Sequence, residues 1–122
     1  MSPGSSMKQP DAIRIQHMLA AANDALQFSK GRSRKGLESD RILALAIIKC
    51  IEIIGEAASK VSNECRDKYP DIPWLDIINM RNRMIHAYHD VNLDIVWATI
   101  IQDLPPLSYD LQNLLASESD SE

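Results

Sequence analysis

Apolar residues recur at every third or fourth position through most of this chain, a spacing typical of α-helices with one buried face. A first helix is predicted from about Pro10 to Ser29, because proline suits a first helical turn and an apolar stripe follows it. The stripe consists of Ile15, Met18, Leu19, Ala22 and Leu26. No stretch of useful length alternates apolar and polar residues as a strand would, so the sequence predicts helices throughout.

A second helix is predicted from Ser39 or Asp40, either of which can cap it, to about Val61. Its first half is apolar nearly all round, which indicates a central helix of a bundle or a subunit interface. Gly55 is costly in a helix interior, so we expect another helix to approach closely there.

Two carboxylates of this second helix, Glu52 and Glu56, lie one turn apart and could form a catalytic pair. Lys49 and Lys60 lie three and four residues from them, at spacings that favour ion pairs along one side of a helix. We therefore favour a structural role for both carboxylates.

Prolines and polar turns divide the second half of the chain. After a turn region at residues 69–73, a third helix is predicted from Trp74 to about Tyr88 or His89. A fourth helix follows a predicted Asn92 cap, and Pro105-Pro106 is expected to end or sharply kink it before a last helix at about 107–115. The sequence thus predicts an all-α, up-down bundle of four to five helices.

The length of 122 residues suggests one domain, which we place at residues 10–116. Residues 1–9 look like a disordered lead or an expression scar, and residues 117–122 like a frayed acidic tail.

The longest apolar stretch, residues 42–54, is too short to span a membrane and includes two charged residues. Cys50 and Cys65 fit no metal-ligand spacing, and no secretory signal is present. Both are therefore predicted to be reduced thiols of a cytoplasmic protein.

The formal net charge of −4 argues against binding to nucleic acid by bulk charge, although a local basic site is compatible with it. Four basic residues gather in one predicted loop between Ser29 and Gly36: Lys30, Arg32, Arg34 and Lys35. The simpler interpretation is a solvated connector. The alternative is a mobile arm that contacts phosphates.

Reactive side chains gather in one stretch of the third helix, which holds Arg81, Asn82, His86 and Tyr88. At 100° per residue, a separate core face is formed by Ile77, Met80, Met84 and Ala87. Tyr88 shares one edge with Arg81, whereas Asn82 and His86 share another with His89. These polar residues therefore do not fill the core of their own domain.

Apolar residues are interleaved with this outward polar set: Trp74, Leu75, Ile78 and Ile85. An exposed apolar stripe with a tryptophan indicates a partner, and a two-fold related copy is the commonest kind. Arg81 and His86 are separated by about 140° around one helix, which makes it difficult for both to reach one atom. Across a two-fold axis, His86 of each copy could meet Arg81 of the other.

These residue types suit phosphodiester chemistry. Histidine titrates near neutral pH and can accept or donate a proton, and arginine binds phosphate through two donors. Asn82 could orient the imidazole or contact a phosphate oxygen. The alternative interpretation is that Arg81 and His86 are ordinary surface residues with no catalytic role. His86 and His89 could also bind a metal, but no further ligand is evident, so no metal and no cofactor are expected.

The stretch resembles a known family. Arg81-Asn82 followed by His86 is similar to the R-N-x3-H signature of HEPN ribonucleases, and with Tyr88 it resembles the R-x4-H-x-Y form of HepT-type toxins. Three further segments look like that family's pattern: Ile53-Ile54-Gly55-Glu56-Ala57, Pro73-Trp74, and Val96-Trp97 through Asp103-Leu104-Pro105. The resemblance covers most of residues 10–115.

The resemblance implies an all-α homodimer in which two R-x4-H motifs face each other and cleave RNA without a metal ion. Arg81 and His86 would be the catalytic pair, with Asn82 the polar residue beside the arginine. It implies a toxin whose antitoxin is an MNT-type nucleotidyltransferase that transfers AMP to Tyr88. Since this chain is acidic, RNA binding is expected from local cations such as Arg83 and the residues between Lys30 and Lys35.

A second hypothesis needs no catalysis by His86. The same apolar face and Tyr88 would suit a helical dimer that acts as a scaffold, or presents a substrate, for a nucleotidyltransferase.

Overall fold

The structure, a computed structural model, describes the backbone of residues 7–90 and 92–120 and the side chains of residues 7–84 and 92–119. All regular structure in these ranges is helical, which confirms the predicted all-α class. The elements are α1 (Gln9–Ser29), α2 (Arg34–Ser39), α3 (Arg41–Ser59), α4 (Asn63–Lys68), α5 (Trp74–Asp90), α6 (Leu93–Ala98), the π-helical η2 (Thr99–Asp103) and α7 (Leu104–Asp120).

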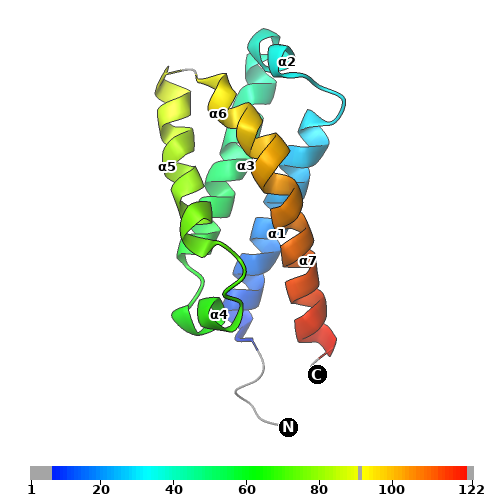
Figure 1. Cartoon of the computed structure of the whole chain (residues 1–122), viewed down its shortest axis with the longest axis vertical. Coiled ribbons are helices and arrows are strands. Elements are labelled where there is room, and N and C mark those ends of the chain that lie inside the picture. The colour runs from blue at the N-terminus through cyan, green and yellow to red at the C-terminus, as the bar shows by residue number, and fades with distance from the viewer. Residues whose placement is uncertain (1–6, 91, 121–122) are drawn as a thin grey trace.

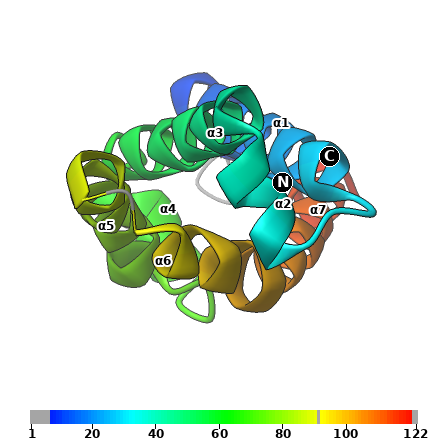
Figure 2. The ribbon, with the colours of Figure 1, turned by 90° about the horizontal axis from the view of Figure 1, so that it is seen from above.

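Four long helical segments run up and down beside one another (Figure 1). α1 packs on α3, α3 packs on α5, and the continuous α6–η2–α7 segment returns along α1, so that the end of α7 lies at the same end of the bundle as the start of α1 (Figures 1 and 2). The short helices α2 and α4 lie at opposite ends of the bundle (Figure 1). The sequence therefore predicted the long helices and their up-down course correctly.

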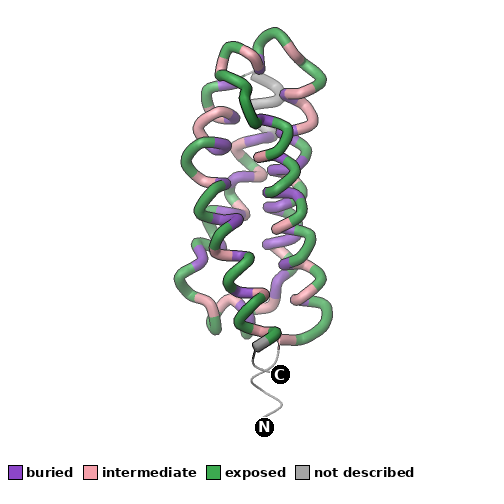
Figure 3. Tube along the Cα trace, turned by 90° about the vertical axis from the view of Figure 1, so that its right-hand side faces the viewer, coloured by how far each residue is buried: buried purple, intermediate pink, exposed green. Residues whose placement is uncertain are grey.

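Buried residues lie on the sides of the long helices that face one another (Figure 3). The largest fully buried ones include Ile15, Met18, Ile47, Ile51, Ile54, Ile77, Met84, Leu104 and Leu111. Each contributes about 1.5–3 kcal/mol by leaving water. Ile77, Met80 and Met84 are all buried, which confirms the core face predicted for the described part of α5.

Side-chain caps begin several helices where the sequence predicted them. The Asp40 carboxylate accepts a hydrogen bond from the backbone N–H of Leu43 at 3.0 Å, at the start of α3. Asn92 accepts one from the N–H of Ile95 at 3.4 Å, at the start of α6. Ser62 caps α4 in the same way, but this short helix was not predicted because it carries no apolar stripe of its own.

Pro105-Pro106 was predicted to end or sharply kink the helix, and the helix does not end there. Helical structure continues through η2 into α7, and the N–H of Leu104 donates to the carbonyl of Thr99 across a wider π turn. Both prolines directly follow this wider π turn, and the helical backbone continues although neither proline supplies an N–H donor.

Two shorter segments also differ from the prediction. Arg34 and Lys35 belong to α2 and not to a loop, since the Ser33 hydroxyl caps that helix by accepting from the N–H of Gly36.

Trp74 was expected to be exposed, but it is only 6% exposed and its indole Nε1 donates to the carbonyl of Tyr69 at 3.0 Å. Burial of the indole is possible because the turn before α5 supplies that acceptor.

The acidic segment that begins at Ser117 is helical as far as Asp120, where a frayed tail was expected. The Glu118 carboxylate accepts from the backbone N–H of Met7 at 2.9 Å and from Lys68 Nζ at 2.8 Å, and it also bonds the Tyr69 hydroxyl. Burial, followed by this bond to Glu118, raises the pKa of Tyr69 to about 12. These contacts join the two ends of the chain, whereas residues 1–6 and 121–122 lie outside the described residues.

Both cysteines, Cys50 and Cys65, are buried as unpaired thiols, as predicted. Burial raises the pKa of Cys65 to about 11 and also raises that of Cys50.

None of the described helices has the length and apolar character needed to cross a membrane.

The closest approach of α3 to α5 occurs at Gly55. A Cβ atom built there would lie 2.7 Å from the Cβ of Arg81 and 3.2 Å from the carbonyl oxygen of Ile77. Such a distance is shorter than van der Waals contact allows, so only glycine lets the two helices meet in this way. The predicted reason for a glycine in this helix is therefore confirmed.

We predict that Gly55→Ala lowers the free energy of unfolding by about 1–3 kcal/mol, because the added methyl group must push α5 away. Urea denaturation measures the change. Gly36→Ala is the matched control, since a Cβ there meets nothing nearer than the Ser33 Oγ at 3.6 Å. It should be neutral or stabilise by up to about 1 kcal/mol. Equal stability of the Gly55→Ala variant and the parent would contradict the packing account.

Candidate functional site

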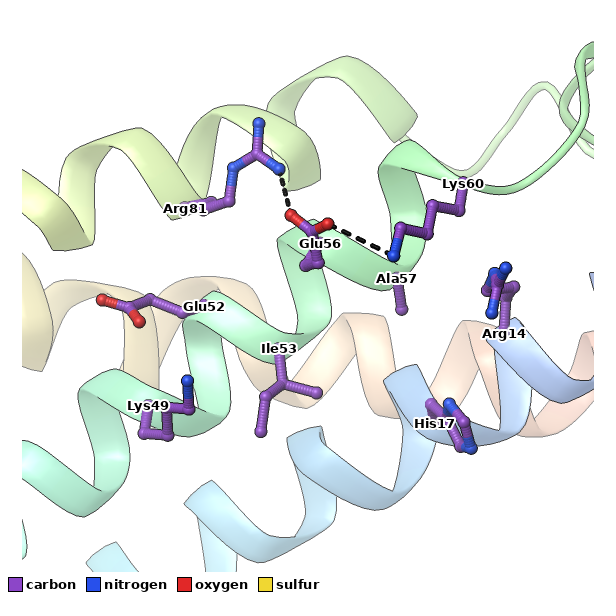
Figure 4. Close-up of a pocket in the computed structure, with 9 residues that line it drawn as sticks. All are labelled: Arg14, His17, Lys49, Glu52, Ile53, Glu56, Ala57, Lys60 and Arg81. Carbon is purple, nitrogen blue, oxygen red and sulfur yellow. Dashed lines mark hydrogen bonds and ion pairs between the residues drawn. The ribbon is translucent and has the colours of Figure 1, made fainter.

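Arg81 lies in the middle of α5, directly against the α3 backbone at Gly55. Its Nη1 donates to Glu56 Oε2 at 2.5 Å, and the other Glu56 oxygen lies 3.5 Å from Lys60 Nζ (Figure 4). Two adjacent residues of α3 thus position Arg81, since Gly55 admits its backbone and Glu56 binds its guanidinium.

The hydrogen bond from Arg81, and then that from Lys60, lowers the pKa of the Glu56 carboxyl below its ordinary value. Glu56 is therefore ionised at neutral pH and holds one edge of the guanidinium. The pairing of Glu56 with Lys60 was predicted from helical spacing and is confirmed. The pairing with Arg81 was missed, because no local spacing reveals which residue of another helix faces Glu56.

A groove of about 430 Å³ is formed by residues of α1, α3 and α5, with Arg81 part of its lining (Figure 4). Four cationic residues line it: Arg14 from α1, Lys49 and Lys60 from α3, and Arg81 from α5. His17 and two carboxylates, Glu52 and Glu56, also line it, with Ile53 between them. Helical spacing gave no sign of this groove because its residues come from three different helices.

The two residues that follow Arg81 point elsewhere. Asn82 is exposed to solvent. Arg83 lines a separate hollow between α5 and the η2–α7 segment, together with Asp76 and Asp103. Burial raises the pKa of Asp103, and the charge of Arg83 partly opposes that shift. The two arginines therefore occupy different faces of α5, although both were predicted to contact one RNA.

Two of the four basic residues between Ser29 and Gly36 have intramolecular partners. Arg34 donates to Asp94 at 2.6 Å and to Glu38 at 2.9 Å, and Arg32 lies 3.8 Å from Asp40. Lys30 and Lys35 are exposed, and neither forms an ion pair with any side chain that the structure describes. Of this predicted set, the two lysines are thus the more available for a phosphate.

His86 and Tyr88 lie on the last turns of α5, and their side chains are outside the described residues. Five residues of α-helix separate His86 from Arg81, which corresponds to about 7.5 Å along the axis and about 140° around it. Positions 81 and 86 therefore lie on different sides of one α5 helix. Among the side chains that the structure describes, no three His, Cys, Asp or Glu residues cluster as metal ligands would.

The chain matches the protein family described as Ribonuclease HepT-like over residues 18–114. It is 34% identical over 112 residues to the protein named Putative RNase TTE0752 of Caldanaerobacter subterraneus subsp. tengcongensis, which covers 92% of this chain and 99% of that protein.

Two further relatives come from archaea. The chain is 36% identical over 108 residues to the Probable ribonuclease HepT of Thermococcus cleftensis, covering 88% of this chain and 98% of that protein. It is 30% identical over 98 residues to Putative RNase MJ1380 of Methanocaldococcus jannaschii, covering 80% and 90%. No solved structure matches the chain. Since the family match extends from the middle of α1 into α7, and these relatives match over nearly their full lengths, the chain belongs to the HepT-like ribonuclease family.

Proposed function

We propose that this protein is a metal-independent endoribonuclease whose site combines Arg81 and His86, and that it acts as the toxin of a toxin–antitoxin pair. The observation that carries the proposal is the position of Arg81. Its guanidinium is held by Glu56 in the lining of a cationic groove, in a chain with the R-x4-H-x-Y pattern and of the HepT-like family.

The proposed reaction is transfer of the RNA phosphoryl group to the neighbouring 2′-oxygen. A histidine accepts the 2′-hydroxyl proton, the 2′-oxygen bonds to phosphorus, and the bond from phosphorus to the 5′-oxygen breaks. The departing 5′-oxygen takes up a proton, so the products carry a 2′,3′-cyclic phosphate and a 5′-hydroxyl. Arg81 stabilises the negative charge that builds on the phosphoryl oxygens.

We propose that two copies complete the site across a two-fold axis. The separation of Arg81 and His86 around α5 favours this arrangement, because one copy alone cannot easily direct both to a single phosphate. The outward side of α5 also carries apolar surface, since Leu75 is 72% exposed and Ile78 is only partly buried. A second copy would cover this surface.

The proposed partner is a nucleotidyltransferase antitoxin of the MNT type that transfers AMP from ATP to Tyr88. Tyr88 lies seven residues, about two turns, after Arg81, so both are on the same side of α5. A phosphate attached there would compete with the RNA phosphate for the guanidinium and repel the substrate.

We predict that the purified chain cleaves RNA in EDTA and leaves 2′,3′-cyclic phosphate ends. Replacing either Arg81 or His86 by alanine should slow cleavage by about 10²-fold or more, because each removes a group that acts in the transition state. Gel analysis of labelled fragments, with mapping of the end groups, measures both effects. Expression of the parent alone should stop growth, and expression of either variant should not.

Arg41→Ala is the matched control for this prediction, since Arg41 is an exposed arginine that lies outside the groove. It should cleave at the parental rate. If His86→Ala cleaves RNA and stops growth as well as the parent does, the catalytic assignment is wrong. A variant with both Arg81 and His86 replaced by alanine tests the second hypothesis. If it keeps full function in complex with the nucleotidyltransferase, the protein acts as a non-catalytic scaffold.

We predict that Glu56→Gln lowers kcat by about tenfold while KM stays the same or falls, because a neutral amide orients Arg81 less firmly but repels the RNA phosphates less. Steady-state cleavage of a short RNA measures the two constants. Glu52→Gln is the control, since Glu52 lines the same groove one turn earlier and has no ion pair among the described side chains. A Glu56→Gln variant that cleaves as fast as the parent would show that the ion pair does not position Arg81.

We predict that incubation with a nucleotidyltransferase antitoxin of the MNT type, together with ATP, adds AMP to Tyr88 and stops cleavage. Peptide mass spectrometry locates the modification. Tyr88→Phe should stay unmodified and active under the same conditions, while modification at Tyr109, which is exposed on α7, would contradict the assignment.

A further inference from the structure

The groove beside Arg81 has a charge opposite to that of the chain as a whole. Four of the residues that line it are cationic and two are anionic, whereas the whole chain has a formal net charge of −4. The cations come from α1, α3 and α5, so folding alone brings them together.

The cations of the groove are not neutralised by pairing within the molecule. The two short ion pairs on its wall share one carboxylate, Glu56, between Lys60 and Arg81. Lys49 is exposed, and Arg14 has a buried Nε with no hydrogen-bond partner among the described residues. The groove therefore retains positive charge that an anionic ligand could satisfy.

The shape of the groove suits a chain of phosphates better than a single anion. Lys49 and Lys60 mark its length along α3, and eleven residues of α-helix span about 16 Å. That length is enough for more than one phosphate, since even along the axis of a DNA duplex the charges of one strand repeat only about every 3.4 Å. Ile53, which is 40% exposed, lies between the lysines and offers an apolar surface to a base or ribose.

We propose that this groove binds the sugar-phosphate backbone of single-stranded RNA and leads it to Arg81, with Arg14, Lys49 and Lys60 contacting phosphates beside the one that is cleaved. The inference rests on the proposed ribonuclease function and names the surface that holds its substrate. It places the substrate between α1 and α3, and not on the Lys30–Lys35 segment, where two arginines already pair with carboxylates.

A second copy of this chain is the competing occupant. In a two-fold contact made groove to groove, the same surface faces itself, so an excess of cations over carboxylates, four against two, would meet an equal excess. Like charges opposed at short range disfavour that contact. The charge of the groove therefore favours RNA.

The test compares two charge reversals in the full chain, both in a His86→Ala background that prevents cleavage during binding. Lys49→Glu reverses a charge in the groove and leaves the Glu56 ion pairs in place. Lys8→Glu makes the same change in net charge outside the groove, where Lys8 forms an exposed pair with Glu64 at 3.5 Å. The probe is a fluorescein-labelled single-stranded RNA of mixed sequence, and its anisotropy is measured at several salt concentrations.

Lys49→Glu should weaken RNA binding about tenfold. It should also make the plot of the logarithm of the association constant against the logarithm of salt concentration less steep, by about 0.7 or more for each lost phosphate contact. Lys8→Glu should change the affinity by less than about twofold, because it alters only the distant field. In the cleaving protein, Lys49→Glu should raise KM and leave kcat nearly unchanged.

Equal effects of the two reversals, or none from either, would overturn the groove assignment. If the parent cleaves RNA while Lys49→Glu keeps its KM, the ribonuclease proposal stands and the groove proposal falls. If the parent neither binds nor cleaves RNA, both fall. A Lys49→Glu variant that binds RNA normally but changes its mass in sedimentation would make the groove a contact between copies, which also overturns the proposal.

Discussion

The close approach of α3 to α5 at Gly55 is the constraint on which the proposed site depends. It brings the Arg81 backbone against α3 and leaves Glu56, the next residue, able to bind the guanidinium at 2.5 Å. A larger residue at position 55 would separate the helices and remove Arg81 from its carboxylate partner. Helix packing and the placement of a candidate catalytic group are therefore one feature of this fold.

The distribution of charge explains how an acidic chain could act on RNA. At the α2 end of the bundle, Arg32 pairs with Asp40, and Arg34 pairs with both Glu38 and Asp94. The charge of these two arginines therefore stabilises the fold locally. In the groove between α1 and α3, cations outnumber carboxylates. A polyanion would be attracted to that groove although the whole molecule carries negative charge.

The sequence predicted what depends on local spacing and missed what depends on contacts between helices. The long helices, the Asp40 and Asn92 caps and the reason for Gly55 were predicted correctly, because apolar periodicity and cap chemistry are local. Trp74 was misplaced because its burial depends on a carbonyl in the preceding turn. The Glu56–Arg81 pair joins residues 25 positions apart, which no pattern in a single sequence reveals. The dimer and the role of His86 stay predictions.

The central claim is that Arg81 of one copy acts with His86 of another. Mixing the Arg81→Ala and His86→Ala proteins, after mild dissociation and reassociation, tests it most directly. If the site is shared between copies, about half of the dimers are mixed and each of these has one intact site, so about a quarter of the parental RNA cleavage should return. If the mixture stays as inactive as its two components, while sedimentation shows that mixed dimers have formed, Arg81 and His86 do not act across the interface.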